Sequence, residues 1–337
     1  MHNRITNILI VRKHNQIGDI LCSLSLYKAI KKKYPDSHIT LVASKTNYEI
    51  SFFELNPYIN RVLVYDKSSI SNISRFFSQL KDRLYDFGFV PSTIKVSRTS
   101  HIINYLAKSK IRVGVKSIDG VKNKSSFLLN LKYDFNWKDK HQLIRNLEIA
   151  KLAGFDLSED EIKDIKINFS DGDIFFAKNF INENFPERTK KIIAFHPGAG
   201  KLINTYPTEK FLELIKKLYN KYYNYVLITS GWTDKDIVNK MTYCLNKLSI
   251  KYKVVHNLPV KKLGAILSMV DLFITNDTGT MHIAGFSGAR VISLFGPTNP
   301  LEWSPIYKDC YYIKSKTDKI FDIDVEDIFN LSTTIIK

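Results

Sequence analysis

The chain has 337 residues, of which 44% are hydrophobic and 25% are charged, and its formal net charge is +17. This length is enough for two domains that each bury a core, and the composition is that of an ordinary globular protein. The apolar run at 8–11 is too short for a signal peptide, no run approaches the ~20 residues of a membrane helix, and the three cysteines match no disulfide or metal-ligand spacing. We therefore expect a cytoplasmic protein without a metal site.

Short apolar runs alternate with amphipathic stretches along the chain, which is typical of parallel βαβ units. In the first half the pattern predicts strands at 7–11, 38–43, 61–65, 86–90 and 111–115 and helices at 19–33, 71–84, 100–108 and 141–153. The second half predicts strands at 191–196, 223–229, 252–255, 272–275 and 291–295 and helices at 208–219, 234–245, 263–269, 280–286 and 325–331. We expect an α/β protein with one domain at 1–170, a polar linker at 171–190 and a second domain at 191–337.

Ligands of open α/β sheets bind beyond the carboxyl ends of the strands, where loops lead into helices. The loop after the first predicted strand carries Arg12, Lys13, His14 and Gly18, and Asp19 opens the next helix. Asp19 could be a simple N-cap, which aspartate does well. An N-cap does not require three basic neighbours, however. A carboxylate beside cations at the end of a strand indicates a functional site.

Two further loops in the second half suit an anion. The first is His-Pro-Gly-Ala-Gly-Lys at 196–201, where Gly198 and Gly200 expose backbone N–H groups and Lys201 adds a charge; a tight turn without a ligand is the alternative. The second is Thr-Asn-Asp-Thr-Gly-Thr-Met-His at 275–282, which leads into a helix whose N-terminus suits a diphosphate. His282 lies one helical turn after Thr278, although a buried core histidine is the alternative for it.

These motifs resemble glycosyltransferase family 9, the bacterial ADP-heptose:lipopolysaccharide heptosyltransferases. The motifs that carry the resemblance are Ile-Gly-Asp at 17–19, His-Pro-Gly-Ala-Gly at 196–200, Tyr-Pro at 206–207, Asn-Asp-Thr-Gly-Thr-Met-His-Ile-Ala-Gly at 276–285 and the segment 291–305. They occur in the family's order from about residue 7 to residue 331. The resemblance implies a GT-B fold, in which two Rossmann-like domains face each other across a cleft and bind the acceptor with the first domain and the donor with the second.

The resemblance also implies roles for individual residues. Asp19 would be the catalytic base, and no metal would be bound. The acceptor would be bound by Arg12, Lys13 and His14. The nucleotide-sugar donor would be bound by Gly198, Gly200, Lys201, Asp277, Thr278, Gly279 and His282. One position departs from the family pattern: these enzymes often carry a lysine two residues before the Tyr206-Pro207 motif, whereas this chain has Asn204, and Lys201 is the candidate replacement.

The expected reaction is an inverting transfer of a heptose or related sugar from a nucleoside diphosphate, ADP-heptose in first place, to the lipopolysaccharide inner core or a related glycan. A positioned carboxylate takes the proton of the attacking hydroxyl, and N–H groups and cations stabilise the departing diphosphate. No cofactor is expected beyond this donor substrate. Two alternatives remain open from the sequence: a sugar-nucleotide epimerase of the same fold and a non-catalytic nucleotide-sugar binding protein. Contacts to the base and ribose are expected at 230–234 and 255–260.

The positive charge belongs almost entirely to the first half of the chain. Residues 1–155 carry 26 Lys and Arg and 11 Asp and Glu, whereas the remaining residues carry 24 and 22. The surplus is either a general lysine enrichment or a sign of an anionic partner, and the absence of a nucleic-acid module argues against DNA or RNA. We expect a phosphorylated glycolipid acceptor and a peripheral position on the cytosolic face of the inner membrane, with 31–33 and 108–124 as contact segments.

Overall fold

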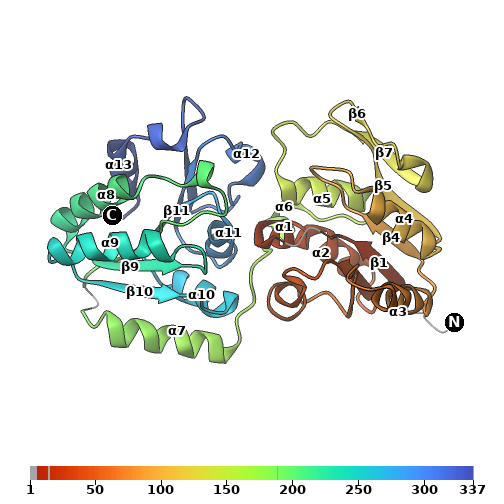
Figure 1. The fold of residues 1–337 in the computed structure, drawn as a ribbon, viewed down its shortest axis with the longest axis horizontal. Coiled ribbons are helices and arrows are strands. Elements are labelled where there is room, and N and C mark those ends of the chain that lie inside the picture. Colours follow the sequence, from red (N-terminus) through yellow and green to blue (C-terminus); the bar gives the residue numbers. More distant parts are fainter. Residues whose placement is uncertain (1–5, 14–15, 188, 337) are drawn as a thin grey trace. The chain divides into compact units, whose positions relative to one another are not determined.

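The computed structural model describes residues 6–13, 16–187 and 189–336, with the backbone alone at 51–53. The chain divides into two compact units, Met1–Ile165 and Lys166–Lys337. Each unit holds one largely parallel sheet with helices packed on it (Figure 1). The two-part α/β architecture expected from the sequence is therefore present, and the boundary lies five residues before the expected one.

The sheet of the first unit has the strand order β3-β2-β1-β4-β5-β6, and β7 pairs with β5 outside this path. All of its strand pairs are parallel except β5 with β6. The strands are β1 (Asn7–Val11), β2 (His38–Ala43), β3 (Arg61–Val64), β4 (Phe87–Val90), β5 (Ile111–Ile118), β6 (Val121–Lys122) and β7 (Leu131–Phe135). The helices are α1 (Ile17–Cys22), α2 (Leu24–Lys33), the π-helix η1 (Ile50–Leu55), α3 (Ile70–Lys81), α4 (Arg98–Leu106), the 3-10 helix η2 (Ser126–Leu128), α5 (Gln142–Lys151) and α6 (Glu159–Lys163).

The sheet of the second unit is entirely parallel, with the strand order β10-β9-β8-β11-β12-β13. The strands are β8 (Ile192–His196), β9 (Tyr225–Ser230), β10 (Tyr252–His256), β11 (Leu272–Asn276), β12 (Val291–Phe295) and β13 (Cys310–Lys314). The helices are α7 (Asp171–Asn184), the 3-10 helix η3 (Leu202–Asn204), α8 (Thr208–Tyr222), α9 (Lys235–Lys247), α10 (Val260–Leu267), α11 (Gly279–Phe286), α12 (Pro300–Trp303), the 3-10 helix η4 (Ile320–Asp322) and α13 (Val325–Ile335).

Both faces of the second sheet are buried, as the continuous apolar sequence of its strands requires. Successive residues of β8 point to opposite faces because side chains alternate along a strand. Ile193 and Phe195 join a core with residues of α8, α9 and α13. Ile192 and Ala194 join a second core with residues of α7, α10 and α11.

The segment 171–190 contains a helix instead of the expected linker. Ser170 caps α7 in a capping box with Asp173, and these polar residues account for the linker-like composition of the sequence. Farther along the helix Ala177 is buried and Phe180 packs against the second core. The segment is therefore part of the second unit, because a helix needs only one apolar stripe to be held on a sheet.

Other elements also differ from the sequence prediction. The helix expected at 19–33 is divided at Ser23, whose hydroxyl donates to the backbone oxygen of Ile20 over 2.7 Å, a local bond that competes with regular helix. The strands β7 and β13 were not predicted. Both lie toward the edge of a sheet and are only partly buried, so their sequences lack a continuous apolar run.

The strand order places a topological switch point in each unit. In the first sheet β1 lies between β2 and β4, and in the second sheet β8 lies between β9 and β11, so the chain leaves the central strand in opposite directions. At such a switch point the loops after the two neighbouring strands run in opposite directions. They leave a crevice between them at the carboxyl ends of the strands. The loops in question are those after β1 and β4 in the first unit and those after β8 and β11 in the second.

Candidate active site

The switch point of the first unit holds a pocket of about 190 Å³. One wall comes from the loop after β1 and the first turn of α1, and the other comes from the loop between β4 and α4. The lining residues are Val11, Arg12, Lys13, Gln16, Asp19, Val90, Pro91, Ser92, Thr93, Ile94, Lys95, Ser97 and Ser100. The structure thus brings three of the residues singled out in the sequence, Arg12, Lys13 and Asp19, to one pocket.

Asp19 is not the N-cap of its helix. That position is taken by Gln16, and Asp19 lies in the first helical turn, where the helix dipole favours a negative charge. Its Oδ1 atom accepts a hydrogen bond from Nη2 of Arg12 over 3.1 Å, and both side chains are largely buried. The carboxylate therefore has a fixed orientation in the pocket wall. The interpretation of Asp19 as a simple N-cap is wrong.

Arg12 is itself held by a residue that the sequence analysis did not single out. Its Nη1 atom donates to Oδ1 of Asn146 on α5 over 3.0 Å. The amide nitrogen of Asn146 in turn donates to the backbone oxygens of Cys22 and Gln142. Asn146 is fully buried. The sequence signal that points to it is a polar residue at a position that an amphipathic helix buries, because buried polar groups need hydrogen-bond partners.

A second buried arginine supports the opposite wall of the pocket. Arg145 of α5 donates from Nη1 to the backbone oxygen of Thr93, 3.1 Å away, and from its other nitrogens to the backbone oxygens of Lys140 and Trp137. Three backbone oxygens thus share one guanidinium, which suits its planar set of donors. The loop after β4 is therefore tied to α5 at the level of the pocket.

Lys13 is the remaining described cation of the loop after β1. Its ammonium lies 5.8 Å from the ring centroid of Tyr65. Partial burial, with a smaller contribution from the nearby charge of Lys67, lowers the pKa of Lys13. His14 lies outside the described residues, so its expected acceptor contact stays a prediction.

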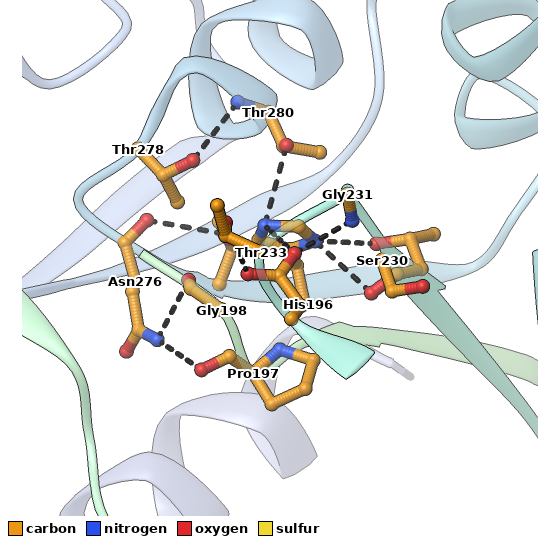
Figure 2. A network of polar contacts seen from close by, with 12 residues as sticks. His196, Pro197, Gly198, Ser230, Gly231, Thr233, Asn276, Thr278 and Thr280 are labelled. Atoms are coloured by element: carbon orange, nitrogen blue, oxygen red, sulfur yellow. Dashed lines mark hydrogen bonds and ion pairs between the residues drawn. The ribbon is translucent and has the colours of Figure 1, made fainter. Parts of the chain in front are cut away.

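The second unit gathers its candidate residues around His196, the last residue of β8. Nδ1 of the imidazole donates to the backbone oxygen of Thr229 over 3.1 Å, and Oγ1 of Thr280 lies 3.4 Å from Nε2. Figure 2 shows the ring at the centre of this network, with Thr280 on one side and Gly231 on the other. Burial lowers the pKa of His196, and the carboxylate of Asp234, 3.8 Å away, opposes the shift. A neutral ring that joins β8, β9 and α11 is a structural element of the site and not a cation for phosphate.

The position of Asp234 is the reason why residue 198, two positions after His196, is a glycine. Its Oδ2 atom accepts a 2.6 Å hydrogen bond from the backbone N–H of Gly231, and the carboxylate is buried against Gly198. A Cβ atom on Gly198 would come well inside 3.0 Å of the carboxyl group, whereas a Cβ atom on Gly200 would meet nothing within 4 Å. Gly198 is therefore required by close packing, and Gly200 is not.

The loops after β8 and β11 are joined by Asn276, another residue without an assigned role in the sequence analysis. Its amide nitrogen donates to the backbone oxygens of Pro197 and Gly198 over 2.8 and 3.0 Å (Figure 2). Its amide oxygen accepts from the backbone N–H of Tyr206. One fully buried side chain thus holds both loops, which keeps their backbone groups in fixed positions.

Asn204, the position that departs from the family pattern, contacts Asp277. Its amide nitrogen donates to Oδ2 of Asp277 over 3.0 Å. Burial raises the pKa of Asp277, while a hydrogen bond with Thr298 and the charge of Lys201 oppose the shift. The exposed Lys201 is therefore close enough to Asp277 to act on it, which supports its place in the same site.

The start of α11 matches the expected anion-binding turn in part. Thr278 is the N-cap, and its hydroxyl oxygen accepts from the backbone N–H of Thr280 over 3.2 Å; Gly279 is the first helical residue (Figure 2). His282 is almost fully buried, and its ring packs edge-to-face on Trp303 at 6.0 Å between centroids. Direct contact of His282 with a donor stays a prediction, and the observed position is that of a core histidine that supports the turn.

Within residues 6–13, 16–187 and 189–336, no three His, Cys, Asp or Glu side chains come together in a way that could bind a metal ion. The carboxylates that lie in the two sites, Asp19, Asp234 and Asp277, are instead engaged with Arg12, with Gly231 and with Asn204.

Comparison with known proteins identifies the family. The model of glycosyltransferase family 9 (heptosyltransferase) matches residues 73–330 of this chain. The chain belongs to glycosyltransferase family 9. The family expected from the sequence motifs is therefore confirmed, and membership of this family favours a glycosyltransferase over the epimerase and the non-catalytic binding protein.

Curated relatives of this family 9 protein are distant in sequence. It is 23% identical to the lipopolysaccharide core heptosyltransferase OpsX of Haemophilus influenzae over 88% of this chain and 81% of that protein. It is 25% identical to the lipooligosaccharide heptosyltransferase 2 of Campylobacter jejuni, but that alignment covers only half of each chain.

Solved structures confirm the fold. The crystal structure of a family 9 glycosyltransferase from Veillonella parvula has a TM-score of 0.79 and 17% identity over 100% of this chain and 98% of that chain. The structure of the Escherichia coli heptosyltransferase WaaC with ADP has a TM-score of 0.72 and 16% identity over 98% of this chain and 99% of that chain. The GT-B fold expected from the motifs is therefore confirmed over the whole chain.

Proposed function

We propose that this family 9 protein transfers a heptose from a nucleoside diphosphate, ADP-heptose in first place, to the inner core of a lipopolysaccharide, with inversion at the anomeric carbon. The observation that carries the proposal is the different chemistry of the two switch points. The first unit offers an oriented carboxylate in a pocket, and the second offers two rigid loops rich in backbone N–H groups beside Lys201. The curated relatives and the ADP-containing structure support the choice of sugar and nucleotide.

The second unit is proposed to bind the donor. The N-terminus of α11 and the Gly198–Lys201 loop would receive the diphosphate, because free N–H groups and a cation stabilise the negative charge that grows on the leaving group. Neither Asp234 nor Asn276 needs to touch the donor in this proposal. They hold the two loops in place, so that little reorganisation is needed when the charge develops.

The first unit is proposed to bind the acceptor and to supply the base. Asp19 would accept the proton of the acceptor hydroxyl as that hydroxyl attacks the anomeric carbon, and the bond to the diphosphate breaks on the opposite face, so that a single displacement inverts the centre. The pair with Arg12 fixes the carboxylate, and Arg12 together with Lys13 would bind acidic groups of the acceptor. The reaction as proposed uses no cofactor, because the diphosphate already activates the sugar.

The proposal is tested by binding and transfer assays with the purified protein. Calorimetry is expected to show tighter binding of ADP than of UDP or GDP. Incubation with ADP-heptose and a lipopolysaccharide that lacks inner-core heptose is expected to give a product whose new linkage has the opposite anomeric configuration, as read by NMR. Equal affinity for the three nucleotides would contradict the choice of ADP, and retention of configuration would contradict the direct displacement.

A peripheral position on the cytosolic face of the inner membrane is proposed as well, because the acceptor is a glycolipid and the first half of the chain carries the positive charge. None of the helices in the described parts of the chain has both the length and the hydropathy needed to span a bilayer. The Lys31–Lys33 segment engages the protein itself: Lys31 donates to the backbone oxygen of Ser37, Lys32 pairs with Glu161, and Lys33 donates to the backbone oxygen of Gly154. The lysines of the other candidate segment, 108–124, are exposed.

Co-sedimentation with vesicles tests this attachment. We expect binding to vesicles that contain phosphatidylglycerol, no binding to phosphatidylcholine vesicles, and a loss of binding as salt is added, because charges farther apart than about 8–10 Å are screened at physiological ionic strength. Equal binding to both kinds of vesicle would contradict an electrostatic attachment. Tighter binding to duplex DNA at physiological salt would contradict a membrane partner.

A further inference from the structure

The outward face of α4 in the first unit is apolar instead of polar. Ile102, Tyr105 and Leu106 have the i, i+3, i+4 spacing of one helix face, and their exposed fractions are 38, 50 and 38%. The opposite face carries the buried residues His101 and Ile103 and packs on the sheet. An exposed helix face normally carries polar residues, so three apolar side chains in a row require a reason.

A fourth apolar side chain, Phe127 of η2, belongs to the same surface. Its exposed fraction is 77%, although η2 packs against α4. Arg112 connects the two elements, because its guanidinium carbon lies 5.5 Å from the ring centroid of Tyr105 and its Nε atom donates to the backbone oxygen of Leu128 over 2.7 Å. We call Ile102, Tyr105, Leu106 and Phe127 the α4–η2 surface.

Basic residues flank the α4–η2 surface along the chain. The segment 94–132 contains nine Lys or Arg residues and a single acidic one, Asp119. The side chains of five of these basic residues are exposed and make no ion pair with the described part of the chain; they are Lys95, Arg98, Lys108, Lys122 and Lys124. An apolar centre with an unpaired basic rim is complementary to an anionic lipid headgroup layer over acyl chains.

The surface is continuous with the acceptor pocket through α4. The pocket is lined, just before and at the start of this helix, by Ile94, Lys95, Ser97 and Ser100. Leu106 of the α4–η2 surface is the last residue of the same helix. From Ser97 to Leu106 the helix advances about 14 Å, which is the reach of a few sugar residues and is well under the thickness of a bilayer. A lipid that stays in the membrane can therefore present its sugar to the pocket.

We infer that the α4–η2 surface inserts into the anionic cytosolic leaflet and that α4 leads a lipid-linked acceptor from the bilayer to the Asp19 pocket. The inference rests on the proposed function, and it adds an apolar insertion to the electrostatic attraction. A protein partner is less consistent with the surface, because its four apolar side chains are flanked by unpaired lysines that a protein interface core normally excludes.

Vesicle binding by single variants tests the surface. Phe127→Ser is expected to lower the partition coefficient onto phosphatidylglycerol-containing vesicles about tenfold, since a buried Phe contributes that much or more to transfer from water. Leu106→Ser provides a second, independent test. Phe175→Ser is the matched control, because Phe175 of α7 in the second unit is an exposed phenylalanine as well, with an exposed fraction of 67%. This substitution is expected to leave vesicle binding unchanged. Thermal unfolding of each variant checks that the fold is intact.

Insertion itself is measured by fluorescence and lipid quenching. Phe127→Trp is expected to add emission that shifts to the blue with vesicles and is quenched by brominated acyl chains, whereas Phe175→Trp is expected to add emission that does neither. Unchanged vesicle binding of both Phe127→Ser and Leu106→Ser, or an unquenched Phe127→Trp, would overturn the inference. Transfer to a water-soluble acceptor oligosaccharide is expected to survive in Phe127→Ser, and its absence in the wild-type protein would count against the proposed function and not against the surface.

Discussion

The substitution Asp19→Asn is expected to lower kcat about 100-fold or more, because loss of a general base costs on that order. Asn has the shape of Asp, and its amide oxygen can still accept the hydrogen bond from Arg12, so the pocket wall keeps its geometry. It cannot take a proton from the acceptor hydroxyl. Steady-state transfer rates with saturating donor and acceptor measure the effect directly.

Donor binding separates a catalytic effect of Asp19→Asn from a structural one. The proposed donor loops belong to the other unit, so calorimetry is expected to show an unchanged affinity for ADP. Asp66→Asn is a suitable control, because Asp66 is a carboxylate of the same unit that is paired with Lys45 and lies outside the pocket lining. A rate above about a tenth of the wild-type rate in Asp19→Asn would contradict the assignment of the base.

The substitution Gly198→Ala is expected to weaken ADP binding by more than about tenfold. The new methyl group would overlap the carboxyl group of Asp234, which the backbone N–H of Gly231 holds in place. Either Asp234 or the loop after β8 must then shift, and overpacking of this kind costs about 1–3 kcal/mol. The shift would displace the backbone N–H groups proposed to receive the diphosphate, and calorimetry with ADP measures the loss.

Gly200→Ala is the matched control for this experiment. The chemical change is the same and the position is two residues away in the same loop, but the added Cβ atom meets nothing within 4 Å. We expect an affinity for ADP close to that of the wild-type protein. Equal losses in both variants would show that the glycines serve backbone freedom and not the packing on Asp234, and wild-type affinity in Gly198→Ala would place the diphosphate elsewhere.

The sequence alone determined the fold class and the position of the candidate loops. Alternating apolar runs and amphipathic stretches encode strands and helices locally, so β1, β8 and β11 could be found within a residue of their observed bounds. Because the carboxyl ends of parallel strands share one edge of a sheet, the residues that follow them could be assigned to sites before any contact was known. The motifs at 17–19, 196–200 and 276–285 then indicated the family.

Only the tertiary structure decided how these residues act. Arg12 and Asn146 are 134 positions apart, and Asn276 and Pro197 are 79 apart, so no local pattern predicts that they meet. The burial of His282 against Trp303, the packing of Gly198 on Asp234 and the joining of α4 with η2 likewise depend on how helices cover a sheet of a given strand order. The physical reason is that hydrophobic periodicity specifies which face of an element is buried, whereas the partner of that face is set by the packing of the whole unit.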